Sequence, residues 1–327
     1  MSPGATGRKI AWWVLSFLVS GVLLYYSLRG VDWAGVWRTI AGAEWQYLAC
    51  AAAITSGSFF LRALRWRILL NAEGSFGIGT VFWANMAGYL GNNFLPARAG
   101  ELLRSVLISS RSNLSKTYVL TTALSERLMD VIALVLGASL VLLTVDPKPR
   151  WMEDLSRTMA IVATIGAAAI MVLPHSGTLS EKVLARIPMP AGLRHRLMKL
   201  AEQILLGMRA FHDWSRFAGF VCLTLAIWAV DSAAAIIAAR GLGLHFSFGV
   251  ALLLLTGMGL GSALPSTPGY VGVYQFVAVT ILTPFGITRD AALAYILVVQ
   301  VSGYVVVTVF GLTGLYRLQS GALRLRI

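Results

Sequence analysis

Charged residues are scarce in this chain of 327 residues, since only 13% are Asp, Glu, Lys or Arg whereas 57% are hydrophobic. Soluble domains carry charge on about a quarter of their residues, so this composition excludes a soluble protein and indicates an integral membrane protein. Only two cysteines are present, Cys50 and Cys222, and both lie within apolar runs, which excludes a disulfide framework and a cysteine metal site. The 4 histidines match no spacing of metal ligands, and we expect no cofactor.

Acidic residues are also few, with 14 Asp and Glu against 27 Lys and Arg, which gives a net charge of +13. In a soluble protein this excess would suggest a nucleic acid partner. In a membrane protein the positive-inside rule and anionic lipid headgroups explain it better, so we expect no nucleic acid. Lys and Arg are concentrated in the segments that would be cytoplasmic if both termini lie inside.

Six apolar runs are predicted to be full membrane spans, at residues 10–28, 47–61, 117–145, 159–173, 217–239 and 291–316. The first exceeds the apolar region of a signal peptide and is interpreted as a retained helix. The second is expected to continue into residues 62–67, where the cations Arg62, Arg65 and Arg67 can snorkel to the interface. Residues 174–216 are predicted to be a basic amphipathic connector on the inner leaflet, with an ordinary solvated connector as the alternative.

Two further apolar runs, residues 78–95 and 246–285, are interrupted by proline and polar residues. Aligning the two breaks superposes four identical residues, namely Gly88 on Gly257, Leu95 on Leu264, Pro96 on Pro265 and Gly100 on Gly269. Paired interrupted segments of opposite orientation are typical of an inverted repeat with the binding site between its halves. We therefore predict one all-α polytopic membrane domain, residues 1–327, with about six full spans and two broken or re-entrant helical hairpins. Its halves would be approximately residues 1–145 and 159–327.

Residues 92–104 form the most unusual stretch, because two amides, a proline, a glycine, a carboxylate and two guanidiniums follow a short apolar run. Non-helical backbone and charges persist at membrane depth only where protein or a water-filled cavity covers them. Arg98 lies beside a predicted helix start, and such an N-terminus with a nearby guanidinium binds phosphate. Arg104 is either a second ligand or a snorkelling cation. Glu101 is either a first-turn cap partner or the ion-pair partner of Arg98 or Arg127.

Charged residues also occur early in the predicted span 117–145. Glu126 and Asp130 share a helix face and would repel each other unless they face protein, water or cations. A purely structural salt-bridge cluster is the alternative to a functional role for these residues and Arg127. Asp231 lies near the middle of another predicted span, where it is either structural or a proton-coupling site.

Three motifs resemble the lysylphosphatidylglycerol synthase transmembrane-region family: Asn93-x-x-Pro96-x-Arg98-x-Gly100-Glu101-x-x-Arg104, Ser125-Glu126-Arg127-x-x-Asp130 and Pro265-x-x-Pro268-Gly269-x-x-Gly272. The resemblance covers nearly the whole chain and implies a flippase-like domain that moves or presents membrane lipids. One departure is Gln275, which stands where this family often has an acid. The soluble aminoacyl-transfer domain of the synthases has no counterpart in these motifs, so no synthase activity is expected.

We therefore expect a lipid transporter of the bacterial inner membrane that binds an anionic headgroup in a polar groove. The alternative is a non-transporting subunit that presents a lipid to a separate synthase or glycosyltransferase. An enzyme is not expected, because the sequence has no metal-binding helix motif, no Gly-x-Ser-x-Gly and no histidine paired with a nucleophile. The predicted substrate-binding residues are Asn92, Asn93, Arg98, Glu101, Arg104, Glu126, Arg127, Asp130, Ser266, Thr267 and Gln275, and Asp231 and Glu126 are the candidates for proton coupling.

Overall fold

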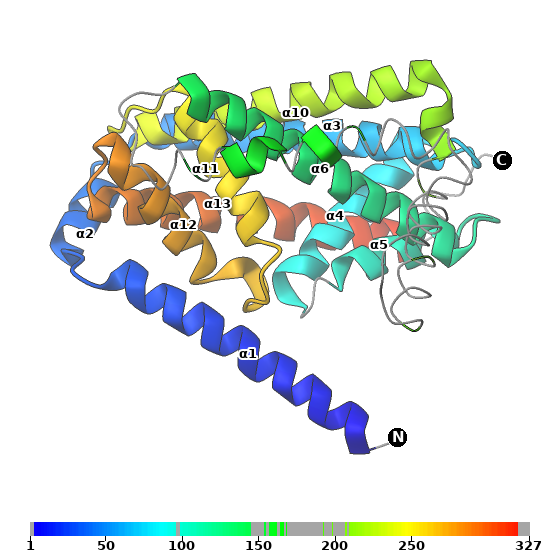
Figure 1. Cartoon of the computed structure of the whole chain (residues 1–327), viewed down its shortest axis with the longest axis horizontal. Coiled ribbons are helices and arrows are strands. Elements are labelled where there is room, and N and C mark those ends of the chain that lie inside the picture. Colours follow the sequence, from blue (N-terminus) through cyan, green and yellow to red (C-terminus); the bar gives the residue numbers. More distant parts are fainter. Residues whose placement is uncertain are drawn as a thin grey trace.

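A computed structural model describes residues 3–95, 99–144 and 209–319, with isolated positions between 154 and 207. Within these ranges the chain is helical and contains no strand, which confirms the predicted all-α class (Figure 1). The longer helices are α1 (Pro3–Leu28), α2 (Trp33–Ala41), α3 (Trp45–Leu70), α4 (Ile78–Phe94), α5 (Gly100–Ser109), α6 (Lys116–Thr144), α10 (Trp214–Gly241), α11 (Phe248–Gly261), α12 (Val273–Leu282) and α13 (Arg289–Gln319). Short 3₁₀ turns are η3 (Arg209–His212), η4 (Pro268–Tyr270) and η5 (Thr283–Phe285).

Three of these helices are long and apolar enough to cross a membrane, namely α3, α10 and α13. A fourth span results if α1 and α2, which are bent by 84° relative to each other, are counted together. The prediction of six full spans is therefore not confirmed. Helix α6 covers the predicted span 117–145 but carries Glu126, Arg127 and Asp130. Most of the predicted span 159–173 and of the predicted connector 174–216 lies outside the described residues.

Helix α2 was not predicted and has a clear local cause. Asp32 adopts an extended backbone, and its side chain accepts a hydrogen bond from the backbone N–H of Ala34 at 3.0 Å, which is the geometry of a helix N-cap. The turn places α2 at the far end of the molecule from both chain termini (Figure 1).

Both predicted helix breaks are confirmed. Helices α4 and α5 form one tight hairpin, because a Cβ built on Gly100 would lie only 1.9 Å from the carbonyl oxygen of Gly88. Helices α11 and α12 form the second hairpin, joined through η4. In that connection Gly272 has φ of 89°, and a Cβ there would lie 2.3 Å from the carbonyl oxygen of Ser20 on α1. Glycine is required at these contacts because no side chain fits between the backbones.

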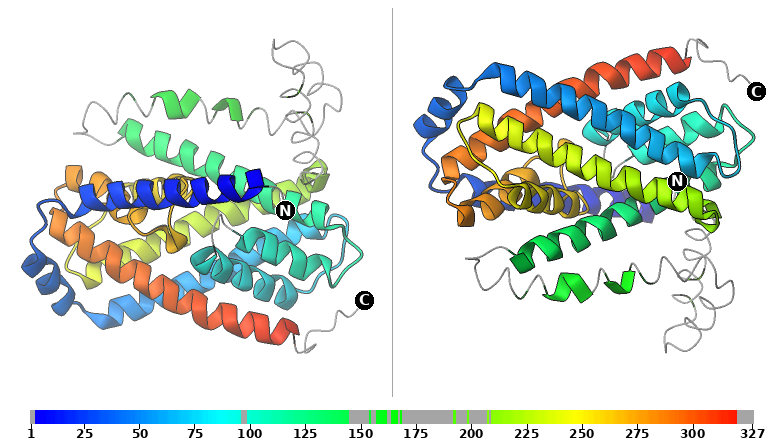
Figure 2. Two further views of the ribbon diagram at one scale, coloured as in Figure 1. Left: turned by 90° about the horizontal axis from the view of Figure 1, so that it is seen from below. Right: turned by 90° about the horizontal axis from the view of Figure 1, so that it is seen from above.

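The helices are paired in a regular way. Helix α3 packs against α10, α4 packs against α13, and α6 packs against α11. The two hairpins extend from opposite ends of the molecule, and their turns approach each other near its middle (Figures 1 and 2). A Cβ on Gly269 in the second turn would lie 3.6 Å from the carbonyl oxygen of Asn93 at the end of α4. Trp45 and Trp214, which begin α3 and α10, are separated by the same number of residues as Pro96 and Pro265.

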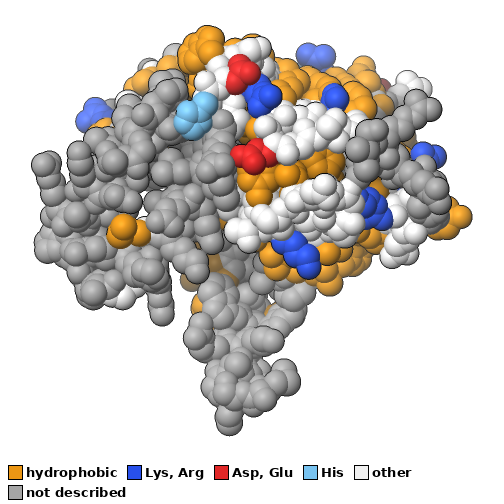
Figure 3. Space-filling model, turned by 90° about the vertical axis from the view of Figure 1, so that its right-hand side faces the viewer, with side chains coloured by type: hydrophobic (Ala, Val, Ile, Leu, Met, Phe, Trp, Pro, Cys, Tyr) orange, Lys and Arg blue, Asp and Glu red, His pale blue; other side chains and the backbone are white. Residues whose placement is uncertain are grey.

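The orientation in the membrane stays a prediction. The first residues of α1 and the last residues of α13 lie toward the same end of the molecule (Figure 1). Figure 3 shows several Lys and Arg side chains on that end, between areas of hydrophobic surface. This arrangement is the one that the positive-inside rule requires of a cytoplasmic face.

A labelling experiment checks this orientation. In a chain whose Cys50 and Cys222 are replaced by serine, we expect Arg240→Cys to react with an impermeant thiol reagent in intact cells. Lys116→Cys lies in the opposite connection and should react only after the membrane is opened. Both positions are exposed on the isolated protein, so each serves as the accessibility control for the other. The reverse pattern would place both termini outside.

Candidate functional site

A cavity of about 420 Å³ lies between α3, α4, α6, α10, α11 and α13. Cavities of this size are typical of small-molecule sites. One part of its wall carries ionisable side chains: Arg62, Glu101, Arg127, Asp130 and Asp231. Much of the remaining wall is apolar, with Leu254, Leu255, Met258, Val298 and Val299 among its residues. The cavity therefore offers a charged region and an apolar region to one ligand.

Arg65 on α3 organises the charges behind this wall. Its side chain is fully buried and donates to both carboxylate oxygens of Asp130, at 2.5 and 2.8 Å. It also donates to Glu126 at 3.0 Å and to the hydroxyl of Thr224 on α10 at 3.1 Å. The predicted repulsion between Glu126 and Asp130 on one face of α6 is thus relieved by a cation from α3. Bidentate pairing of this kind is among the strongest hydrogen bonding in proteins.

Arg104 on α5 occupies the other side of Glu126. Its Nη1 donates to Glu126 at 3.1 Å and to Asn85 on α4 at 2.5 Å, and its Nε lies 2.5 Å from Glu101. The guanidinium also lies 4.4 Å from the ring centre of Trp66, which is a cation–π contact. Arg104 is 1% exposed and does not line the cavity. Its predicted alternative as an interfacial snorkelling cation is wrong, because α3, α4 and α6 cover it.

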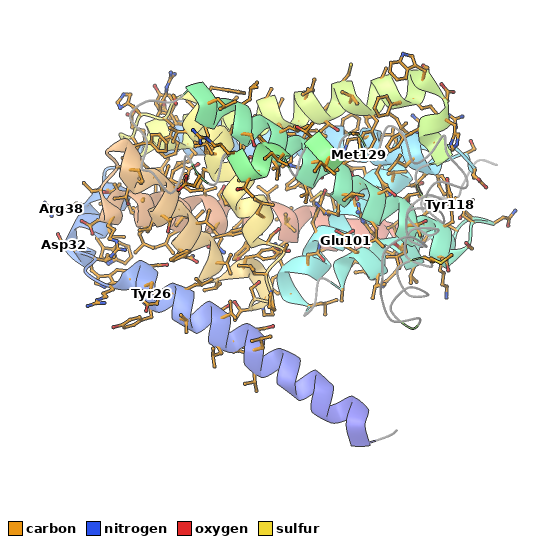
Figure 4. The ribbon with its side chains drawn as sticks, viewed as in Figure 1. Tyr26, Asp32, Arg38, Glu101, Tyr118 and Met129 are labelled. Carbon is orange, nitrogen blue, oxygen red and sulfur yellow. The ribbon has the colours of Figure 1, made fainter. Side chains whose placement is uncertain are left out.

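Arg127 faces the cavity from α6. Its Nε and Nη2 both donate to Oε1 of Glu101, at 2.9 and 2.8 Å, which confirms the predicted ion pair between these residues. Glu101 lies where α5 approaches α6 (Figure 4). The side chain of Arg127 is 32% exposed, against 0% for Arg65 and 2% for Arg104. We call the six side chains of Arg65, Arg104, Arg127, Glu101, Glu126 and Asp130 the charged network. Its three cations and three anions balance.

A separate ion pair crosses the cavity wall from α3 to α10. Arg62 donates to Asp231 with Nη2 and Oδ2 2.5 Å apart, and both side chains are 13% exposed. The guanidinium lies 5.3 Å from the ring centre of Trp228. The sequence left the partner of Asp231 open, and the structure identifies it as Arg62.

Gln275 has a structural position rather than one in the cavity wall. Its Oε1 accepts from the backbone N–H of Gly272 at 2.7 Å, and its amide donates to Gln300 at 2.6 Å. Gln300 in turn donates to the carbonyl of Gly269 and to the hydroxyl of Tyr304, each at 2.7 Å. Gln300 and Tyr304 do line the cavity. An acid at position 275 would therefore be connected to the cavity residue Tyr304 only through Gln300.

The remaining predicted residues separate into three groups. Asn92 and Asn93 line the cavity. Ser266 and Thr267 do not, and the backbone N–H of Thr267 instead donates to the hydroxyl of Ser20 on α1 at 2.9 Å. Arg98 lies outside the described residues.

Sequence reasoning missed the roles of Arg62 and Arg65. Both were predicted to snorkel to the interface because the apolar run preceding them ends at residue 61. The helix does continue as predicted, to Leu70, but snorkelling is wrong for these two residues because neighbouring helices cover Arg65 and Arg62 faces the cavity. One available signal was their spacing of three residues, which places both on one helix face. The other was that Arg62 and Asp231 are as far apart in sequence as Pro96 and Pro265.

Comparison with known proteins shows the family of this chain. The family described as lysylphosphatidylglycerol synthase TM region matches residues 13–311. A glycosyltransferase named AglD from Haloferax volcanii is 25% identical over 87% of this chain, and the chain spans 50% of that relative's length. Two proteins of Methanothermobacter thermautotrophicus, each named UPF0104 membrane protein, are 21% and 23% identical. The first match covers 90% of both chains and the second covers 91%.

Proposed function

Because the chain belongs to the family of the lysylphosphatidylglycerol synthase TM region, we propose that it is a transporter that moves membrane lipids across the bilayer. The observation that carries this proposal is the divided wall of the cavity, charged in one part and apolar in another. A phospholipid has the same division, since its phosphate needs hydrogen-bond donors and its acyl chains need apolar surface. The headgroup would be anionic and would contact Arg127 and the neighbouring amides Asn92 and Asn93.

The arrangement of the helices supports an inverted repeat as the basis of transport. A shift of 169 residues, the separation of Pro96 and Pro265, places α3 on α10, α4 on α11 and α6 on α13. The packed pair α4–α13 in this way corresponds to the packed pair α6–α11, and the pair α3–α10 corresponds to itself. Transporters built this way bind their substrate between the halves and open alternately to the two sides. In this proposal the protein lies in a bacterial inner membrane with both termini in the cytoplasm, and it catalyses no covalent reaction.

A second candidate function is presentation of a lipid to a separate enzyme. It is favoured by the relative from Haloferax volcanii, which is named a glycosyltransferase and is about twice as long as the region matched by this chain. A membrane region within such an enzyme could hold the lipid on which the rest acts. The same cavity would then bind lipid without moving it between leaflets.

Reconstitution separates these functions. We expect vesicles that contain the purified protein to move fluorescent phosphatidylglycerol from the inner to the outer leaflet, where a membrane-impermeant quencher reaches it. Arg127→Gln should slow this movement by about tenfold or more, because it removes charged hydrogen bonds worth about 1.5–3 kcal/mol. Arg38→Gln is the matched control, since Arg38 is 77% exposed on α2.

The outcomes of this experiment are distinct. Lipid that co-purifies with the protein but does not change leaflet would support presentation and reject transport. Protein that neither binds nor moves phosphatidylglycerol would reject the lipid site itself.

A further inference from the structure

The Arg62–Asp231 pair differs from the charged network in how it is held. Arg65 contacts two carboxylates and Glu101 contacts two arginines, so removal of one partner leaves each with another. Among the described residues, Arg62 and Asp231 have ion-pair distances only to each other. Both line the cavity. This pair can therefore open without disturbing the network behind it.

The position of the pair is also special. Arg62 and Asp231 are 169 residues apart, as are Pro96 and Pro265, so the two are the same position in the two halves of the chain. Their helices α3 and α10 pack against each other. In an inverted repeat, equivalent residues that touch lie on the axis between the halves, and the site there is shared by the inward and outward states.

The indole of Trp228 lies next to this pair. The indole Nε1 of Trp228 is buried and has no hydrogen-bond partner among the described residues, although the ring lines the cavity beside the Arg62 guanidinium. Unpaired buried N–H groups are rare and require an explanation. Tyr89 on α4 also lines the cavity, and the guanidinium of Arg127 lies 5.9 Å from the centre of its ring. An oxygen-rich anion placed beside the pair would meet the guanidinium of Arg62 and the indole N–H of Trp228.

From these contacts we infer that Arg62 is the principal ligand of the lipid phosphate and that Asp231 occupies it until the lipid arrives. This inference rests on the proposed lipid-binding function and identifies the residue that recognises the headgroup. On binding, a phosphate oxygen replaces the Asp231 carboxylate at the Arg62 guanidinium, and the carboxylate takes up one proton from a hydronium ion or a buffer acid in the solvent. The lipid brings one negative charge and the proton one positive charge, so the site remains neutral. Without the proton, two anions would share one cation in a desolvated site, which is costly.

The surroundings of Asp231 favour this exchange. It receives Arg62 from α3, while α11 contributes only uncharged residues to the cavity wall. The other titratable or charged groups near the pair are Arg65 on α3, Tyr89 on α4, Asp130 on α6 and Tyr295 on α13. Arg65 and Asp130 are already bound to each other, and the hydroxyl of Tyr295 donates to the carbonyl of Ala235. If Arg62 moves away from Asp231, that carboxylate has no other ion-pair partner among the described residues.

Binding measurements with two lipids test the inference. The probes are dioleoylphosphatidylglycerol and uncharged dioleoylglycerol in detergent micelles, measured with the full chain between pH 5 and pH 9. For wild type, the affinity for phosphatidylglycerol should fall as the pH rises, because binding takes up one proton. Asp231→Asn should bind phosphatidylglycerol with an affinity that no longer changes with pH, because no proton is needed.

Arg62→Gln provides the second arm. It should weaken binding of phosphatidylglycerol by about 10- to 100-fold, since a charged hydrogen-bond donor is lost, and should leave dioleoylglycerol unchanged. Glu44→Gln and Arg38→Gln are the controls, because both residues are exposed and lie away from the cavity. If Arg62→Gln fails to fold, the double variant Arg62→Gln with Asp231→Asn retains a neutral hydrogen-bonded pair and should lose both the phosphate preference and the pH dependence.

The result separates this inference from the proposed function. If wild type binds phosphatidylglycerol but Arg62→Gln binds it equally well, or if Asp231→Asn keeps the pH dependence of wild type, the inference is wrong and the proposed function stands. If wild type binds phosphatidylglycerol no better than dioleoylglycerol, the anionic headgroup is wrong and the inference fails with it.

Discussion

Replacement of Arg65 by methionine is expected to destabilise the folded protein by about 3–5 kcal/mol, the usual cost of removing one partner from a buried ion pair. The side chain is fully buried and is the only described cation that binds both Glu126 and Asp130 at 3.0 Å or less. Its loss would leave two carboxylates on one face of α6 without that cation. We expect a large fall in the melting temperature of the protein in detergent, together with poor expression.

Arg38→Met is the matched control for this experiment. Arg38 also pairs with a carboxylate, Asp32, at 3.2 Å, but its side chain is 77% exposed and projects from α2 at the opposite end of the molecule from Tyr118 (Figure 4). Exposed pairs of this kind contribute about 0–1 kcal/mol, so the melting temperature should change little. Equal melting temperatures for the two variants would show that Arg65 is not buried among these carboxylates.

A double-mutant cycle makes the expectation for Arg65 sharper. Asp130→Asn removes one of the two carboxylates that Arg65 neutralises, so in the Arg65→Met background it should restore part of the lost stability. In the wild-type background the same change should destabilise, because Arg65 then loses a bidentate partner. This opposite sign is the coupling expected of residues in direct contact. Additive effects would mean that the two side chains do not interact.

The helix breaks and several charge contacts could be predicted from the sequence because their causes are local. Proline at positions 96 and 265 cannot continue a helix, and both breaks are confirmed. The spacing of Glu126 and Asp130 predicted that they must face protein, water or cations, and the first-turn position of Glu101 allowed its pair with Arg127. In each case the argument needed only neighbouring residues or the membrane's intolerance of unpaired charge.

The cations that pair with Asp130 and Asp231 were missed, because they come from a helix distant in sequence. Arg65 reaches Asp130 across 65 residues and Arg62 reaches Asp231 across 169. A hydropathy argument assigns a cation to the interface where an apolar run ends, whereas α3 remains enclosed by α6 and α10 beyond that point. Asp32 was likewise missed as a helix start, since its cap depends on a single side-chain contact.

Gly100→Ala is expected to separate the two helices of the first hairpin, with a loss of about 1–3 kcal/mol or more from overpacking. The added methyl group would lie 1.9 Å from the carbonyl oxygen of Gly88 and 2.6 Å from the backbone nitrogen of Asn92. These are backbone atoms, which cannot turn aside as a flexible side chain can. Helix α5 must therefore move away from α4, and with it Glu101, the next residue, which lines the cavity and holds Arg127. We expect lower thermal stability and weaker lipid binding together.

Gly57→Ala is the matched control, because it makes the same chemical change inside α3. A Cβ at Gly57 would meet no atom within 4 Å. Alanine is favoured over glycine within a helix by about 0.5–1 kcal/mol, so this variant should be slightly more stable than wild type and bind lipid equally well. The two substitutions thus have opposite expected signs, which thermal melting in the same detergent can resolve. If both raise the melting temperature, α4 and α5 do not approach each other at Gly100, and the hairpin cannot position Glu101 against the cavity.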